Sequence, residues 1–117
     1  MATINVSTDA ELATALNTTA AAGDVIELAA GATFAASGTY FTSGRNFGSN
    51  EANQVIIKSA DPNDRAIIVR IGFRDWIGLA FEDINFFGNK TVQPGFGDET
   101  GATIYLKDCT NIRVGGA

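Results

Sequence analysis

The 117-residue sequence predicts an all-β solenoid, in which the chain winds through successive coils of short parallel strands. The first observation is an internal repeat, because residues 71–81 align without a gap on residues 104–114, 33 positions later. Each copy reads apolar-x-apolar, a basic residue, an aspartate, three turn residues and apolar-x-apolar again. The second is that three short apolar segments recur in each pass, at a spacing of roughly 20 to 30 residues that is typical of solenoid coils. Parallel coils require such a repeat in register, whereas an antiparallel sandwich does not.

The third observation is that no segment after Asn17 has helical periodicity. A doubly wound α/β fold needs a helix between successive parallel strands, so the pattern excludes it. The length, with 45% hydrophobic residues, suits one domain with its own core, and we assign residues 1–117 to a single domain.

Charge and composition exclude several classes of function. The net charge is −5 and the basic residues are scattered, which argues against a nucleic-acid partner. No apolar run is long enough to insert in a membrane, and the N-terminus lacks a signal-peptide pattern. Cys109 is the single cysteine and there is no histidine, so the sequence offers no disulfide, no zinc spacing and no histidine-based triad. We therefore expect neither a metal nor a cofactor.

The sequence of residues 1–24 predicts a short first strand followed by a capping helix. Ile4 and Val6 alternate with polar residues near the start of the chain, which indicates the strand. Thr8 is suited to be the helix N-cap, and Glu11, three residues later, completes a capping box. Leu12 and Leu16 then fall on one helical face. We expect this helix to cover the first coil, with both leucines inward, and to shield the open backbone edge of that coil.

Residues 25–114 predict the coils, interrupted by insertions at 42–53 and 87–103. The expected strands are, in chain order, Val25–Leu28, Thr33–Phe34, Thr39–Phe41, Val55–Lys58, Ala66–Val69, Ile71–Phe73, Leu79–Phe81, Ile84–Phe86, Ile104–Leu106 and Ile112–Val114.

Inward side chains of a parallel coil stack on the equivalent residues of the next coil, about 4.8 Å away. The first expected column takes, coil by coil, Ile26 with Leu28, Val55 with Ile57, Leu79 with Phe81, and Ile112 with Val114. The second takes Phe34, Ile68, and Ile84 with Phe86, and the third Phe41, Ile71 with Phe73, and Ile104 with Leu106. Each buried side chain contributes roughly 1.5 to 3 kcal/mol, so these columns supply most of the stability.

Several of these motifs resemble those of a known family. The chain is similar to the N-terminal start of right-handed parallel β-helix proteins of the pectate-lyase-like superfamily, and the resemblance covers nearly all of it. The matching stretches are 6–12, 23–28, 31–34, 55–59, 65–68 and the two repeated segments. The resemblance implies a right-handed parallel β-helix of about three coils with a short N-terminal α-helical cap. Such motifs encode coils and a cap rather than chemistry.

The far end of the predicted solenoid is uncapped. The sequence Val114-Gly-Gly-Ala117 follows the first strand of a coil and brings neither a helix nor a charged edge to close it. An open solenoid end is an aggregation hazard. We expect the chain to be the N-terminal part of a longer protein, with stacking of this end on another chain as the alternative.

The two insertions and one corner hold the candidate ligand-binding residues, because loops carry binding more often than the scaffold does. The candidates are Arg45, Phe47, Trp76, Lys90, Phe96, Asp98 and Glu99. The competing interpretation is that the loops are solvated connections in which Phe47 and Phe96 serve as anchors. For Trp76 the favoured alternative is packing with its N–H hydrogen-bonded, since Cys109 holds the same repeat position.

No catalytic constellation stands out, so whether the chain is an enzyme stays open. Lyases with this fold need a cation to neutralise a uronate carboxylate and a Lys or Arg base. The sequence places Arg74 and Lys107 beside Asp75 and Asp108, which suggests corner ion pairs instead. The adjacent carboxylates Glu82 and Asp83 have no spacing that selects them for a glycosidase.

The resemblance implies two functional groups, polysaccharide lyases or glycosidases, and spike proteins of phages or virus-like particles that attach to surface glycans. The absent catalytic set and signal peptide favour the spike. In that hypothesis the segment is a structural attachment module in a virion or outside the cell. Its partners would be other particle proteins or identical chains, as a homotrimer, and its glycan recognition would lie in coils beyond Ala117. The alternatives are an N-terminal fragment of a lyase or glycosidase and a bacterial surface adhesin.

Overall fold

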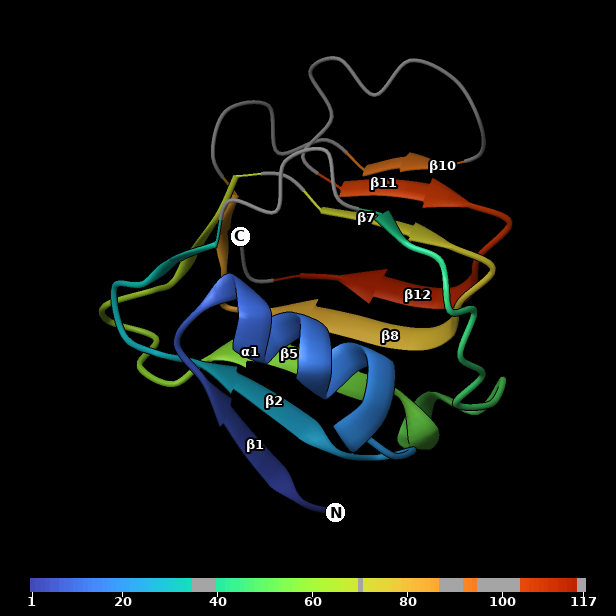
Figure 1. The fold of residues 1–117 in the computed structure, drawn as a ribbon, viewed down its shortest axis with the longest axis horizontal. Coiled ribbons are helices and arrows are strands. Elements are labelled where there is room, and N and C mark those ends of the chain that lie inside the picture. Colours follow the sequence, from blue (N-terminus) through green and yellow to red (C-terminus); the bar gives the residue numbers. More distant parts are fainter. Residues whose placement is uncertain (35–39, 70, 87–91, 95–103, 116–117) are drawn as a thin grey trace.

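The computed structural model describes residues 1–34, 40–69, 71–86, 92–94 and 104–115 (Figure 1). These residues are mostly β, with parallel strands and one short α-helix. The helical segments are α1 (Asp9–Thr14), a π-helical turn (Ala15–Thr19) and a 3-10 turn (Glu51–Asn53). The strands are β1 (Thr3–Val6), β2 (Val25–Leu28), β3 (Thr33–Phe34), β4 (Tyr40–Phe41), β5 (Val55–Ser59), β6 (Ile67–Ile68), β7 (Ile71–Arg74), β8 (Ile77–Glu82), β9 (Asn85–Phe86), β10 (Val92–Pro94), β11 (Ile104–Lys107) and β12 (Thr110–Val114).

The strands form three sheets in which neighbouring strands are parallel. Their orders are β1-β2-β5-β8-β12, β10-β11-β7-β4 and β3-β6-β9. Three successive passes of the chain reach the three sheets in the same order: β2, β3 and β4, then β5, β6 and β7, then β8, β9 and β11. The third pass also adds β10 to the four-stranded sheet, between β9 and β11 in the chain. The expected first strand and all ten strands expected in the coils are present, and no end of a coil strand differs from its expected position by more than two residues.

The register in the five-stranded sheet differs from the expected first column. Ile26 pairs with Ile57 rather than with Val55, and the line continues through Phe81 and Val114. The prediction was wrong by two residues between β2 and β5. Because side chains alternate with a period of two, a two-residue slip keeps the same residues inward, and the apolar pattern alone cannot detect it.

The other two columns are confirmed except for Ile84, which is buried but lies before β9 rather than in it. In the three-stranded sheet Phe34 pairs with Ile68 and Ile68 with Phe86. In the four-stranded sheet Phe41, Phe73 and Leu106 occupy one line and Ile71 pairs with Ile104. The ring centroids of Phe41 and Phe73 lie 5.3 Å apart in a stacked arrangement. The inward residues of all three sheets belong to one hydrophobic cluster.

The N-terminal helix begins as predicted. The side chain of Thr8 accepts a hydrogen bond from the Glu11 amide at 3.2 Å. The carboxylate of Glu11 turns back to the amide and hydroxyl of Ser7, at 2.7 and 2.8 Å, so the reciprocal bond reaches one residue earlier than in a capping box. Leu12 and Leu16 are buried in the cluster that the strands form. The helix therefore covers one end of the core.

The backbone edge of β2 is covered by a different element than expected. Strand β1 pairs in parallel with β2 along its full length, from Thr3 with Val25 to Val6 with Leu28. The prediction that the helix shields this edge was therefore wrong. The helix closes the apolar interior, β1 pairs with the backbone of β2, and the outer edge of β1 is one border of the five-stranded sheet (Figure 1).

Strand β10 was not foreseen from the sequence. It lies within the second insertion and pairs in parallel with β11, from Val92 with Ile104 to Pro94 with Leu106. It forms one border of the four-stranded sheet, with β4 at the other (Figure 1). A proline is compatible with this position because an edge strand has one row of unpaired N–H groups.

Asp24 ties β1 to the turn after the helix. Its carboxylate accepts hydrogen bonds from the amides of Ala21 and Ala2, both at 2.9 Å. These bonds, that of Ala21 first, hold the pKa of Asp24 below its ordinary value. Because the folded-state pKa is the lower one, the ionised carboxylate stabilises the fold above the ordinary pKa, and this contribution disappears as the pH falls through the folded-state pKa.

We therefore expect wild type to be more stable than Asp24→Asn at neutral pH, and the difference to shrink below about pH 4. Urea unfolding of both proteins at pH 7, 5, 4 and 3 measures this difference. A gap that stays constant over this range would contradict the assignment of the titrating group to Asp24.

Candidate functional site

The two copies of the repeat fold into the same corner. Asp75 and Asp108 both have positive φ, 62° and 55°, and so do Gly78 and Asn111, at 91° and 55°. Each pair occupies equivalent repeat positions. Asp and Asn are the non-glycine residues that tolerate this left-handed conformation best, which explains their presence at these corners.

Trp76 lies inside this corner and is fully buried. Its indole N–H donates a hydrogen bond to the carbonyl of Phe41 at 2.8 Å. Its ring packs edge-on against Phe41 and Phe73, with centroids 6.3 and 5.4 Å away. Packing with a satisfied N–H, the favoured alternative, is confirmed. In this structure the ring presents no free face to a sugar.

The first insertion folds back over this aromatic cluster. Phe47 is buried, 6.1 Å from Trp76 between ring centroids. Arg45 donates from Nη1 to the carbonyl of Leu16 at 3.0 Å, and its guanidinium lies 4.8 Å from the centre of the Phe47 ring. The structure thus brings Arg45, Phe47 and Trp76 together in a packed arrangement that joins the helix to the corner.

The other predicted ligand-binding residues, Lys90, Phe96, Asp98 and Glu99, lie outside the described residues. Binding by any of the seven candidates stays a prediction.

The corner ion pairs are present. The side chains of Arg74 and Asp75 approach to 3.9 Å, and those of Lys107 and Asp108 to 4.0 Å. More than half of the surface of Arg74 and Asp75 is exposed, so water screens their attraction and it adds little stability.

The carboxylates considered for glycosidase chemistry have basic partners. Glu82 accepts from Nη2 of Arg113 at 2.7 Å, and Asp83 lies 3.6 Å from Arg65. Across the described part of the chain, no group of three or more His, Cys, Asp or Glu side chains is placed to hold a metal ion. Within the same residues, no helix has the length and apolar character needed to cross a membrane.

Cys109 is half-buried beneath the corner of the second repeat. Its thiol lies 3.4 Å from the carbonyl of Lys107 and 3.6 Å from that of Phe73. Burial raises the pKa of the thiol, because a thiolate is poorly solvated there.

We therefore expect Cys109 to react with a disulfide reagent more slowly in the folded protein than in urea, and to accelerate only at alkaline pH. The reagent releases a coloured thiolate, and its absorbance, followed between pH 7 and pH 9.5, gives the reaction rates of the folded and the unfolded protein. Equal rates for folded and unfolded protein would contradict the structure around this residue.

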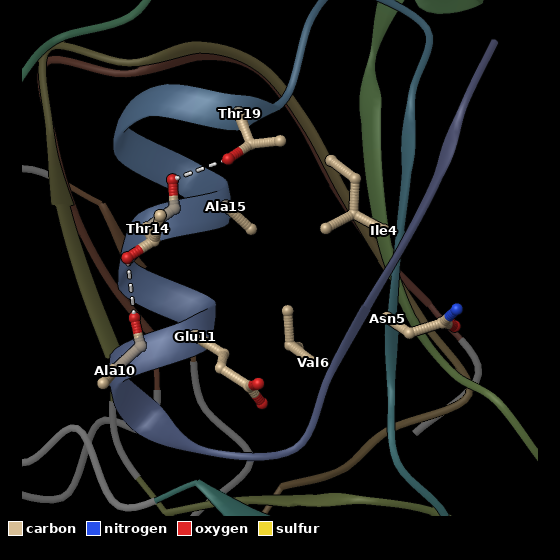
Figure 2. A pocket seen from close by; sticks show the side chains of 8 residues that line it. All are labelled: Ile4, Asn5, Val6, Ala10, Glu11, Thr14, Ala15 and Thr19. Atoms are coloured by element: carbon tan, nitrogen blue, oxygen red, sulfur yellow. Dashed lines mark hydrogen bonds between the residues drawn. The ribbon is translucent and has the colours of Figure 1, made fainter.

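In the described part of the chain, two open hollows border β1, and neither is lined by Arg45, Phe47 or Trp76. One, of about 300 Å³, lies between β1 and the helix and is lined by Ile4, Val6, Ala10, Thr14 and Ala15, among others (Figure 2). The second, of about 260 Å³, lies at the C-terminal end of β1 and includes Glu11 and Glu27 in its lining. Sequence reasoning identified the strand but not which of its edges is free.

No protein-family model matches the chain, and no curated protein matches it. Among solved structures, the chain is similar to the crystal structure of an alginate lyase from Paenibacillus sp. str. FPU-7, with 16% sequence identity and a TM-score of 0.49. The similarity covers 97% of this chain and 58% of the lyase chain. The chain thus spans less than two thirds of the length of that enzyme.

Proposed function

We propose that the three parallel sheets are the faces of a right-handed parallel β-helix of about three coils, closed at one end by the N-terminal helix. Two observations support it. Apart from the additional strand β10, each pass contributes one strand to each sheet in the same order, and the paired strands are parallel throughout. Crossover connections between parallel strands of one sheet are right-handed in about 98% of cases. The fold thus fits the pectate-lyase-like resemblance.

On this fold we propose a structural role, as an attachment module of a phage or virus-like particle spike. The observation that carries it is the packing of Arg45, Phe47 and Trp76. The described residues best suited to hold a sugar are instead bonded to the helix or buried in the aromatic cluster. Glycan contacts would then come from other coils.

The last strand supports a longer coil stack. Among the described strands, β12 is the border of the five-stranded sheet opposite β1, and its inward residues Ile112 and Val114 are only half-buried against the core. A further coil would complete their burial and pair the free backbone edge. We therefore propose that these 117 residues are the N-terminal part of a longer protein.

The first test is the mass and oligomeric state of the protein purified from its source, by mass spectrometry and light scattering. A longer polypeptide that assembles as a trimer, or with other particle proteins outside the cell, supports the proposal. A stable monomer that ends at Ala117 would overturn it.

The alternatives give different results with the same material. A polysaccharide lyase releases unsaturated uronate products from pectin, alginate or chondroitin, detectable by ultraviolet absorbance. An adhesin binds glycans on an array without turnover. Turnover of a polysaccharide by a monomer would therefore favour the lyase over the spike. Glycan binding without turnover by a monomeric full-length chain would favour the adhesin.

The role of Arg45 can be tested in this chain. If Arg45 is a structural residue, Arg45→Ala lowers the free energy of unfolding by about 1.5 to 3 kcal/mol, because a charged hydrogen bond to the Leu16 carbonyl is lost. Arg45→Lys keeps the charge but not the planar group over Phe47. Its free energy of unfolding is expected to lie between those of the wild type and Arg45→Ala. Loss of glycan binding at unchanged stability would instead assign Arg45 to a ligand site.

A further inference from the structure

The outer edge of β1 has backbone groups free for pairing. The carbonyls of Ala2 and Val6 accept hydrogen bonds from the amides of Val25 and Ala29, at 2.8 and 2.9 Å, on the β2 side. Backbone groups alternate in direction along a strand, so those of Thr3 and Asn5 point away from β2. A row of free donors and acceptors on a border strand is a template for a further strand.

The first hollow lies directly beneath this edge. Figure 2 shows the side chains of Ile4 and Val6 directed from β1 toward the helix, with Ala15 opposite them. Ile4 is the end member of the line that continues through Ile26 and Ile57, and it is only half-buried. A strand added to β1 would place its own inward side chain in this hollow, as the next member of the line.

The second hollow is acidic. Both Glu11 and Glu27 line it, and neither hollow is lined by a lysine or an arginine. The hydrogen bonds from Ser7, that of its amide first, lower the pKa of Glu11, so this carboxylate stays ionised well below neutral pH. A negative hollow at the end of an apolar one complements a segment that carries both an apolar and a basic side chain.

We propose that β1 is the docking site for an extended, basic segment of a partner protein, which adds as a further strand to the five-stranded sheet. Its backbone pairs with Thr3 and Asn5, a branched apolar side chain fills the hollow beneath Ile4, and a lysine or arginine reaches Glu11 and Glu27. Main-chain bonds supply affinity in such strand addition, and the pockets supply specificity. The inference stands apart from the spike proposal, because it rests only on the edge and the hollows.

The probe is a synthetic acetylated and amidated heptapeptide, Arg-Thr-Val-Thr-Val-Thr-Arg, with a neutral fluorophore. An arginine at each end serves both parallel and antiparallel addition. The matched control peptide has glutamate at both ends. We expect saturable binding of the arginine peptide by fluorescence anisotropy, weakened by added salt, and binding at least roughly tenfold weaker for the glutamate peptide.

Three variants of the protein locate the binding site. Asn5→Pro removes one outward N–H and is expected to weaken binding roughly tenfold, because proline is tolerated in an edge strand but cannot donate. Glu27→Gln should weaken it about two- to fivefold. Glu51→Gln removes a negative charge from the 3-10 turn, where Glu51 lies 3.8 Å from Arg113 and lines neither hollow, and should leave binding unchanged.

Amide hydrogen exchange on the wild type gives an independent measurement that does not depend on any variant folding. Bound peptide should slow exchange at Thr3 and Asn5. Failure to bind at about 1 mM peptide, or equal affinity of wild type and a folded Asn5→Pro variant, would overturn the proposal. Self-association that Asn5→Pro abolishes would assign the edge to a second copy of the chain and would overturn it as well.

Discussion

Trp76→Ala is expected to lower the free energy of unfolding by about 3 to 5 kcal/mol. The indole is fully buried between Phe41, Phe47 and Phe73, and its removal leaves a cavity where these rings meet. The Phe41 carbonyl also loses the hydrogen bond from the indole N–H. The effect should reach the first insertion, because Phe47 is anchored on this ring.

Because Trp76 is the single tryptophan, the measurement is urea unfolding followed by far-ultraviolet circular dichroism rather than by fluorescence. Trp76→Phe, which keeps a ring but not the N–H, should give an intermediate loss. Arg74→Ala is the control, because Arg74 lies two residues before Trp76 and its side chain is exposed. It should change the free energy of unfolding by less than about 0.5 kcal/mol. A loss below about 1 kcal/mol for Trp76→Ala would show that this ring is not part of a packed core.

Gly78→Ala is expected to destabilise the protein by about 2 to 4 kcal/mol. Gly78 has a φ of 91°, which a residue with a side chain rarely adopts. An added Cβ would also stand 3.0 Å from the Gly48 carbonyl and 3.1 Å from the Phe47 Cβ, so the first insertion would have to move.

Gly115→Ala is the matched control, since its added Cβ meets no atom within 4 Å, and it should be close to neutral. Urea unfolding measures both stabilities. Amide exchange at Phe47, whose N–H donates to the Ile77 carbonyl at 2.8 Å, should accelerate in Gly78→Ala alone. Equal stabilities of the two variants would contradict the close approach of the insertion to this corner.

The repeat shows why the position of Gly78 in β8 is occupied by Asn111 in the neighbouring strand β12. Asn111 has the same left-handed conformation, but its side chain faces the first insertion from one strand farther away. Its amide donates to the Gly48 carbonyl at 3.0 Å, and Gln54 donates to its side-chain oxygen at 3.1 Å. One backbone conformation is thus occupied by glycine where the loop is in contact and by asparagine where the loop is within hydrogen-bonding reach.

Local patterns predicted most of the strands and the helix. Thr8 and the spacing of Leu12 and Leu16 identify the helix, because caps and helical faces depend on residues three to four apart. Alternating apolar residues identify strands for the same reason. The register between β2 and β5 was not predictable in this way, since a slip of two residues changes no side chain from inward to outward.

The candidate site was less predictable because its contacts join distant parts of the chain. The side chain of Arg45 donates a hydrogen bond to the Leu16 carbonyl, and that of Gln54 donates one to the Asn111 carbonyl. No short-range sequence pattern predicts either hydrogen bond. A loop rich in polar and aromatic residues therefore suggests a binding site equally well whether its side chains face solvent or the core. The free edge of β1 depends likewise on which strand borders which, which is a property of the whole sheet.

The register of the five-stranded sheet also places charged residues in a line on its outer face. Glu27 pairs with Lys58, and Lys58 pairs with Glu82. Neighbouring strands are about 4.8 Å apart, and like charges directly opposite each other are unfavourable. Deleting the pass that contains β5 would bring Glu27 and Glu82 opposite each other in the same register. The alternation of charge therefore disfavours a version of the protein that lacks this pass.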